Sequence, residues 1–233
     1  MVRVRDYGEG DVEASWGVSI LGQKRRRTER GKSKDRPKNI ERCNRRARAE
    51  LRRKCMAAGL DHLLTLTYRE NITDLIEARS DFDRFIRKIH EHDADFKYVV
   101  VEEIQKRGAI HFHLGVKGFQ NVFLLRSIWR SVVGEGNVDV NYIKSKKGYR
   151  WSKARLAMYL AKYIGKDMES ELNKKRFRSS QGITIPEKVY YLPFKMSARD
   201  YVLELVKSLG GKVGFVWNSE EGDGLFGWAC SWG

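Results

Sequence analysis

The chain has 233 residues, with 46 Lys and Arg against 30 Asp and Glu, a formal net charge of +16 and 41% hydrophobic residues. This hydrophobic fraction suffices for a globular core, which excludes wholesale disorder. No stretch approaches the roughly 18 consecutive apolar residues of a membrane-spanning helix, and no signal-peptide pattern follows Met1. We therefore expect a cytoplasmic protein without a membrane role, whose partner is a polyanion and most readily nucleic acid.

The positive charge is concentrated in one segment. Residues 24–54 hold 16 Lys and Arg against four Asp and Glu. Within it, residues 39–58 have the composition of an Arg-rich helix. Charge runs this dense usually contact a phosphate backbone, although a solvated basic helix without a specific purpose is the alternative. The candidate DNA-binding residues of this segment are Lys24, Arg25, Arg26, Arg27, Arg45, Arg46, Arg52 and Arg53.

Periodicity predicts the remaining elements in chain order. Alternating or β-branched runs predict strands over 62–68, 96–104, 109–116 and 137–143. Apolar recurrence at helical spacing predicts helices over 73–90, with Thr73 as N-cap, and over 122–132, 152–166 and 197–209. Residues 105–108 form the expected turn of a β-hairpin, and residues 212–217 with 225–232 resemble a second, closing hairpin.

The first hairpin carries a candidate metal site. His111 and His113 are two residues apart in a strand, so both point to the same face. A turn centred on Arg107 pairs Glu103 with His111, whereas a slip of one residue would bring Glu102 to the site instead. Two imidazoles and a carboxylate admit Mg²⁺ or Mn²⁺ as well as zinc or non-heme iron. The basic surroundings favour Mg²⁺ or Mn²⁺ acting on a phosphate.

The predicted helix over 152–166 repeats a tyrosine followed three residues later by a lysine. Tyr159, Lys162, Tyr163 and Lys166 fall within an arc of about 100° on such a helix. A nucleophilic tyrosinate needs a nearby cation, which either lysine could supply while also holding a phosphate. Half-buried packing tyrosines with lysines beside them are the alternative.

Cations also alternate with aromatic rings upstream of this helix. Lys147, Arg150 and Trp151 belong to this stretch, and such combinations bind single-stranded nucleic acid. Arg107, in the turn of the first hairpin, completes the candidate DNA-binding set.

Three motifs in this order resemble the HUH endonucleases that initiate rolling-circle replication in phages and plasmids. They are Leu63–Thr67, His111–His113 and the Tyr-x-x-Lys-Tyr sequence of Tyr159–Tyr163. The resemblance implies an α+β, ferredoxin-like or RRM-like fold, with a central antiparallel sheet flanked by helices. It implies an HUH catalytic core over 61–170, a basic N-terminal segment over 1–60, and a C-terminal extension over 171–233.

The resemblance also implies a reaction. A tyrosine attacks single-stranded DNA at the replication origin, leaving a 5′-phosphotyrosyl enzyme and a free 3′-OH, and the strands are later rejoined. His111, His113 and Glu103 would bind Mg²⁺ or Mn²⁺. Tyr159 and Tyr163 would be the nucleophiles, with Lys162 and Lys166 beside them. Host helicase and polymerase would be the partners in a bacterial cytoplasm, and no small-molecule cofactor is expected.

Three other functions remain open. A transposase of the same superfamily would cut transposon ends with the same residues. A non-catalytic RRM-like protein would use the tyrosines only to stack on bases, but such platforms usually lie on a sheet face. Conjugative relaxases, which place their tyrosine before the histidines, fit less well, because Tyr7 is the only tyrosine in the first 60 residues and no third histidine follows His113 at close spacing.

Overall fold

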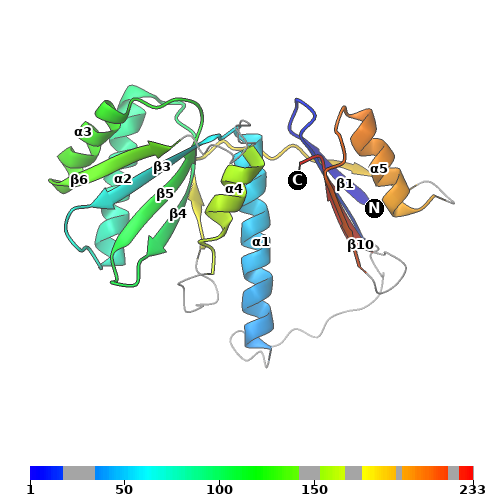
Figure 1. The fold of residues 1–233 in the computed structure, drawn as a ribbon, viewed down its shortest axis with the longest axis horizontal. Coiled ribbons are helices and arrows are strands. Elements are labelled where there is room, and N and C mark those ends of the chain that lie inside the picture. The colour runs from blue at the N-terminus through cyan, green and yellow to red at the C-terminus, as the bar shows by residue number, and fades with distance from the viewer. Residues whose placement is uncertain (18–34, 142–152, 166–174, 193–195, 220–225, 233) are drawn as a thin grey trace. The chain divides into compact units, whose positions relative to one another are not determined.

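The computed structural model describes residues 1–17, 35–141, 153–165, 175–192, 196–219 and 226–232. These residues form an α+β protein with two antiparallel sheets and five helices, which confirms the predicted fold class and is consistent with a ferredoxin-like fold. The chain divides into two compact units, drawn as ribbons in Figure 1. The inserted unit is Asp35–Thr184, and the terminal unit combines Met1–Lys34 with Ile185–Gly233.

The inserted unit is built on a five-stranded sheet with the order β6-β3-β5-β4-β7, in which neighbouring strands are antiparallel. Its strands are β3 (His62–Tyr68), β4 (Tyr98–Ile104), β5 (Ile110–Val116), β6 (Gly136–Asn141) and β7 (Arg178–Ser179). Its helices are α1 (Arg36–Ala57), α2 (Leu75–His92), α3 (Val122–Val133) and α4 (Lys153–Ala161). The first hairpin, the strand over 62–68 and the Arg-rich helix are thus confirmed.

Both faces of this sheet are covered by helices. Phe112 and Leu64 belong to the core cluster that includes residues of α2 and α3. Leu63 and Val101 belong to a second cluster, shared with α1 and α4. Because successive strand residues point to opposite faces, His113, which pairs with Val101, lies on the α1 and α4 side.

The start of α2 corrects one prediction. Asp74, rather than Thr73, is the N-cap residue, and its Oδ1 accepts hydrogen bonds from the backbone N–H groups of Ile76 (2.7 Å) and Glu77 (3.3 Å). A carboxylate at this position satisfies two N–H groups that have no partner within the helix. The helix therefore begins at Leu75.

The terminal unit has a sheet with the strand order β8-β1-β2-β10-β9. Its elements are β1 (Val2–Asp6), β2 (Val12–Gly17), β8 (Lys188–Tyr190), α5 (Ala198–Ser208), β9 (Phe215–Asn218) and β10 (Phe226–Cys230). The predicted helix over 197–209 and the closing hairpin are confirmed. The sequence did not predict β1 and β2, which bring the N-terminal residues beside β10, with Ala14 opposite Ala229.

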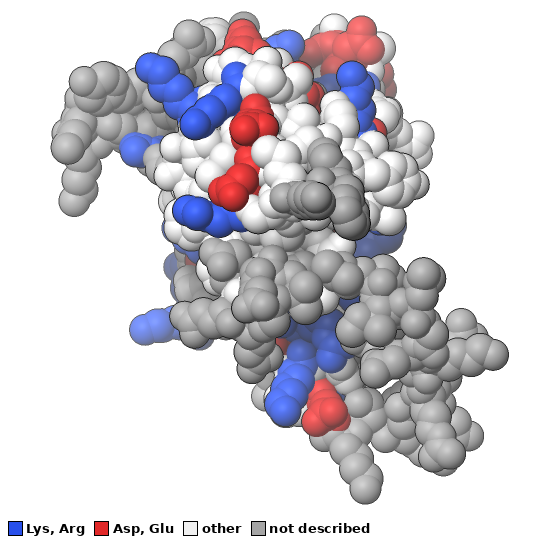
Figure 2. All heavy atoms as spheres, turned by 90° about the vertical axis from the view of Figure 1, so that its right-hand side faces the viewer, with Lys and Arg blue, Asp and Glu red and all other residues white. Residues whose placement is uncertain are grey.

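The described surface carries charges of both signs. On the face drawn in Figure 2, Lys and Arg side chains are interspersed with Asp and Glu around an area of uncharged residues. The most basic run of the sequence, Lys24 to Arg27, lies outside the described residues. Among the helices that are described, none has the length and apolar character needed to cross a membrane.

Candidate functional site

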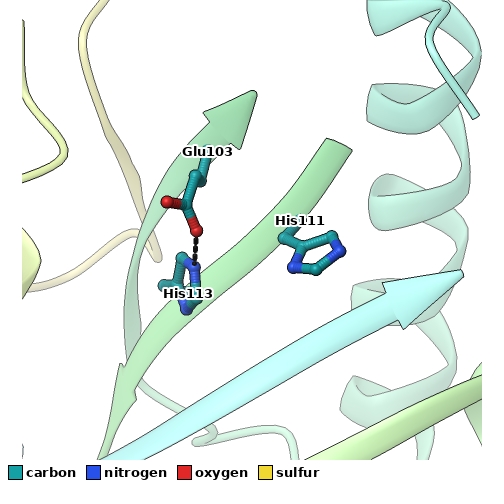
Figure 3. A group of neighbouring side chains, drawn as sticks. All are labelled: Glu103, His111 and His113. Atoms are coloured by element: carbon teal, nitrogen blue, oxygen red, sulfur yellow. Dashed lines mark hydrogen bonds and ion pairs between the residues drawn. The ribbon is translucent and has the colours of Figure 1, made fainter. Parts of the chain in front are cut away.

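The β4–β5 hairpin brings the three predicted metal ligands together. Its register pairs Glu103 with His111 and Val101 with His113, as the turn about Arg107 predicts. The turn itself is closed by a bond from the Gln105 N–H to the Ala109 carbonyl (2.8 Å). Figure 3 shows Glu103 on one strand and both histidines on its neighbour.

The geometry of this cluster fits a single metal ion. The Nε2 of His113 lies 2.8 Å from the Oε2 of Glu103, and one ligand atom from each of Glu103, His111 and His113 lies within 4.8 Å of the others. Ligand bonds of about 2.0–2.2 Å place neighbouring donor atoms roughly 3 Å apart, so small side-chain rotations suffice to surround one ion. Nitrogen and oxygen donors of this kind suit a divalent cation, and their identity alone does not choose which one.

Glu102 points away from the cluster of Glu103, His111 and His113, which is called the metal cluster below. Its carboxylate accepts two hydrogen bonds from the Arg79 guanidinium of α2, from Nε (2.9 Å) and Nη2 (2.7 Å). Such a two-point pairing holds the carboxylate in place. The one-residue slip that would have made Glu102 a ligand is therefore not adopted.

Two residues that the sequence analysis did not single out orient the histidines. The Thr65 hydroxyl lies 3.2 Å from His113 Nδ1, because Thr65 and His113 are direct partners across β3 and β5. A hydroxyl that accepts from Nδ1–H leaves the lone pair of Nε2 directed at the cluster. The Gln105 Nε2 lies 3.1 Å from His111 Nδ1. Only the strand register could have revealed these contacts.

The histidines are kept in the form that binds metals. Burial lowers the pKa of His113 below its ordinary value of 6.5, against the opposing influence of Glu103. Burial also lowers the pKa of His111. A lowered pKa keeps both imidazoles neutral at neutral pH, as metal coordination requires.

The tyrosines lie at the end of α4, which is shorter than predicted. The helix ends at Ala161, and the chain then turns through Ile164 to Gly165, whose φ is 85°. The Arg48 guanidinium of α1 donates to the Ile164 carbonyl (2.8 Å), which holds this turn in place. The helix is therefore shorter at its end than predicted, and Lys166 lies outside the described residues.

The turn nevertheless brings the tyrosine pair to the metal cluster. The ring of Tyr163 stacks on that of His113, with centroids 4.3 Å apart and an angle of 11° between the planes. The Tyr163 hydroxyl donates to that of Tyr159 (3.1 Å). Lys162 Nζ lies 3.6 Å from the ring centroid of Tyr159 and 4.6 Å from that of Tyr163. Three of the four predicted catalytic residues are therefore in mutual contact.

The two tyrosines differ in environment. Tyr163 is only 8% exposed, and burial, together with the hydrogen bond to Tyr159, raises its pKa above the ordinary value of 10.0. Tyr159 is half-buried and accepts the bond from Tyr163. A donated hydrogen bond stabilises a developing phenolate, so the contact favours charge on the Tyr159 oxygen rather than on that of Tyr163.

The structure places only part of the predicted DNA-binding set. Arg45 and Arg46 are exposed on α1, while Arg52 and Arg53 are half-buried. Arg107 is exposed at the hairpin turn, and its Nε donates to Gln105 Oε1 (3.2 Å). The remaining members lie outside the described residues: Lys24, Arg25, Arg26, Arg27, Lys147, Arg150 and Trp151.

Comparison with known proteins adds a family match over this region. Residues 61–168 match the model of a family described as Replication-associated protein ORF2. No curated protein matches the chain. The crystal structure of the hypothetical protein ORF119 from Sulfolobus islandicus rod-shaped virus 1 has 14% sequence identity and a TM-score of 0.35, and the match covers 53% of this chain and 97% of that chain. The family match is consistent with a replication initiator.

Proposed function

We propose that this protein is a replication initiator of the HUH type that nicks single-stranded DNA at a rolling-circle origin. The observation that carries the proposal is the stacking of Tyr163 on His113, which connects the tyrosine pair to a cluster able to hold a metal ion. The match of residues 61–168 to a replication-associated family supports the same function.

Tyr159 is the proposed first nucleophile. Its hydroxyl accepts the hydrogen bond of Tyr163, and the Lys162 ammonium lies over its ring, 3.6 Å from the centroid. The hydrogen bond and the nearby positive charge both favour negative charge on the phenol oxygen. The Tyr159 oxygen forms a bond to the scissile phosphorus while the bond from phosphorus to the 3′ oxygen breaks. The phenol proton is lost and the 3′ oxygen gains one. The products are a 5′-phosphotyrosyl protein and a free 3′-OH.

Glu103, His111 and His113 are the proposed ligands of Mg²⁺ or Mn²⁺. A bound ion would polarise the scissile phosphate and stabilise its developing charge. The residues of the chain hold this site in place: Thr65 orients His113, Gln105 contacts His111, and Tyr163 covers the ring of His113.

Rejoining reverses the chemistry. A 3′-OH attacks the phosphotyrosine, restoring the phosphodiester and releasing the phenol. A second tyrosine would let one DNA end stay attached while another is cut, which is the role proposed for Tyr163 after the first nick. The free 3′-OH is the substrate of a host polymerase, and strand separation falls to a host helicase.

A covalent-adduct assay tests the function. End-labelled single-stranded DNA from the replicon that encodes the protein is incubated with the protein and Mn²⁺, or with EDTA, and run on a denaturing gel. We expect a Mn²⁺-dependent protein–DNA band that is lost with His111→Ala and with Tyr159→Phe. Tight binding of this DNA without an adduct or cleavage would instead indicate a non-catalytic nucleic-acid-binding protein.

A further inference from the structure

A strongly cationic pocket, distinct from the site of Glu103, His111 and His113, lies at the β7 edge of the sheet in the inserted unit. It has a volume of ≈ 660 Å³ and is open between one side of α1 and residues 175–179. The α1 wall includes Arg46, Glu50 and Lys54, which recur at helical spacing and so share a face. Every residue that lines it belongs to one compact unit, Asp35–Thr184.

The charge of the lining selects an anion. Five cationic residues line the pocket against the single carboxylate of Glu50: Arg46, Lys54, Lys175, Arg176 and Arg178, of which Arg178 turns its guanidinium to α2. Lys54 Nζ donates a hydrogen bond to Ser179 Oγ (3.0 Å), which connects α1 to the strand at the sheet edge. Cations and apolar ligands are disfavoured by such a lining, because each cationic group would stay without a counter-charge.

One guanidinium group in this lining has capacity for a further acceptor. The Arg178 guanidinium is turned to α2 instead: its Nη1 donates to Asp83 (2.7 Å), and the group lies 4.6 Å from the ring centroid of Phe82. The Nη1 of Arg176 is buried and makes no hydrogen bond within the described part of the chain. A buried, unsatisfied charged donor is costly, and oxygen atoms of a phosphate would satisfy it.

We propose that this pocket binds a backbone phosphate of DNA. The proposal rests on the proposed function only in naming DNA as the source of the phosphate. Arg46 and Lys175 are exposed at its mouth, where they can contact the flanking phosphates of the same strand.

The pocket is separate from the metal cluster. Along β4, Tyr98 of the pocket is five residues from Glu103 of the cluster, about 16 Å at the usual rise of a strand. Arg178 of the pocket lies opposite Val100, three residues from Glu103, about 10 Å by the same rise. A strand with the rise of B-form DNA, about 3.4 Å per nucleotide, would span these separations with roughly three to five nucleotides. The pocket thus holds DNA beside the nick and takes no part in cleavage.

The test is a salt series of DNA affinity in EDTA, so that no cleavage occurs. Fluorescence anisotropy of a labelled single-stranded oligonucleotide is measured with the full chain, Arg176→Ala, Arg46→Ala and Arg130→Ala. Arg130 is the control because it is an exposed arginine on α3, which packs beside β6 at the opposite sheet edge. A thermal melt of each variant identifies any that has lost its fold, and the exposed Arg46 provides a substitution that leaves the interior intact.

We expect Arg176→Ala to weaken binding roughly tenfold at low salt, as when one charge-assisted hydrogen bond is removed. The slope of log affinity against log salt should decrease by about 0.7 for each phosphate of single-stranded DNA that the variant no longer neutralises. Arg46→Ala should reduce the slope in the same direction, and Arg130→Ala should match the wild type. Affinities and slopes of Arg176→Ala and Arg46→Ala that equal those of Arg130→Ala would overturn the proposal.

Thermal melts with inorganic phosphate distinguish a DNA phosphate from a small free anion as the ligand of the pocket. If phosphate raises the melting temperature of the wild type but not of Arg176→Ala, while DNA affinity is the same for both, the pocket binds a small free anion and the DNA assignment is wrong. Because the binding series contains EDTA, it can be interpreted even if the wild type forms no covalent adduct. Failure of the pocket proposal and failure of the proposed nicking function are therefore distinguishable.

Discussion

His113 and Tyr163 are in face-to-face contact, with ring centroids 4.3 Å apart, although one residue lies in a strand and the other in a turn that follows α4. The contact covers one face of a candidate metal ligand with the ring of a candidate nucleophile. It therefore gives Tyr163 a role in holding the imidazole in place that is separate from the chemistry of its hydroxyl.

Substitutions at Tyr163 can separate these two roles. Tyr163→Phe keeps the ring and should bind Mn²⁺ with nearly wild-type affinity, while adduct formation through Tyr159 slows because the donated hydrogen bond is lost. Tyr163→Ala also removes the stacked ring, and we expect its Mn²⁺ affinity to fall by roughly tenfold. Isothermal titration calorimetry measures the affinity, and equal values for the two variants would contradict the stacking role.

Thr65 should matter for the metal through His113. Thr65→Val has nearly the same shape but no hydroxyl beside Nδ1, and we expect Mn²⁺ affinity to fall about 10–100-fold. Thr67→Val is the matched control, since Thr67 lies on the same strand face and its hydroxyl donates to the Asn137 carbonyl instead. The prediction fails if the two valine variants bind Mn²⁺ alike.

The neighbouring glutamates provide a direct test of the hairpin register. Glu103→Gln should abolish measurable Mn²⁺ binding, because the carboxylate beside His113 Nε2 is lost. Glu102→Gln should leave Mn²⁺ binding intact and only weaken the pairing with Arg79. Loss of metal binding in the Glu102 variant, with retention in the Glu103 variant, would show that the other register operates in solution.

The stability of the metal-free protein should depend on pH through the two ligand histidines. Burial lowers the pKa of both in the folded state, so the unfolded chain binds protons more readily and protonation favours unfolding. Their contribution to stability is complete above about pH 6.5 and is lost as the pH falls below it. Urea unfolding in EDTA at several pH values measures this, and a His111→Gln/His113→Gln variant should show a flatter dependence between about pH 7 and 5.

Phe112 lies between the two histidines in sequence but on the opposite face of the sheet, where it is fully buried. Phe112→Ala should lower the free energy of unfolding by about 3–5 kcal/mol, through reduced burial and the cavity left behind. Phe123 is 82% exposed on α3, so Phe123→Ala should change it by less than about 0.5 kcal/mol. Urea denaturation of both variants checks the difference.

The pattern of neighbouring residues was sufficient to predict the hairpin and the candidate metal ligands that it carries. The alternation in residues 109–116, the turn at Gly108 and the two-residue spacing of His111 and His113 are all properties of neighbouring residues, and they determine which side chains share a face. The end of α4 was not predictable in this way. Its last turn is set by contacts with α1, including the bond from Arg48 to the Ile164 carbonyl, which lies far away in sequence.

The first two strands were missed for a similar reason. Residues 2–6 and 12–17 alternate over only a few positions. They pair with each other as a hairpin, but their outer partners, β8 and β10, come from the other end of the chain. The roles of Thr65 and Gln105 also depend on tertiary structure, since each is defined by a histidine on another strand or beyond a turn. Contacts between residues so far apart in the chain cannot be recognised from a short stretch of sequence.

The division of the chain also dictates an order of events during synthesis. The residues of the inserted unit leave the ribosome as one continuous block, so its sheet can be completed while the C-terminal residues are still untranslated. The strands β1 and β2 must wait for β8 and β10 before their sheet is complete. The unit that holds the candidate metal site and the tyrosines can therefore acquire its fold before the terminal unit does, and a released chain that ends at Thr184 should already bind Mn²⁺.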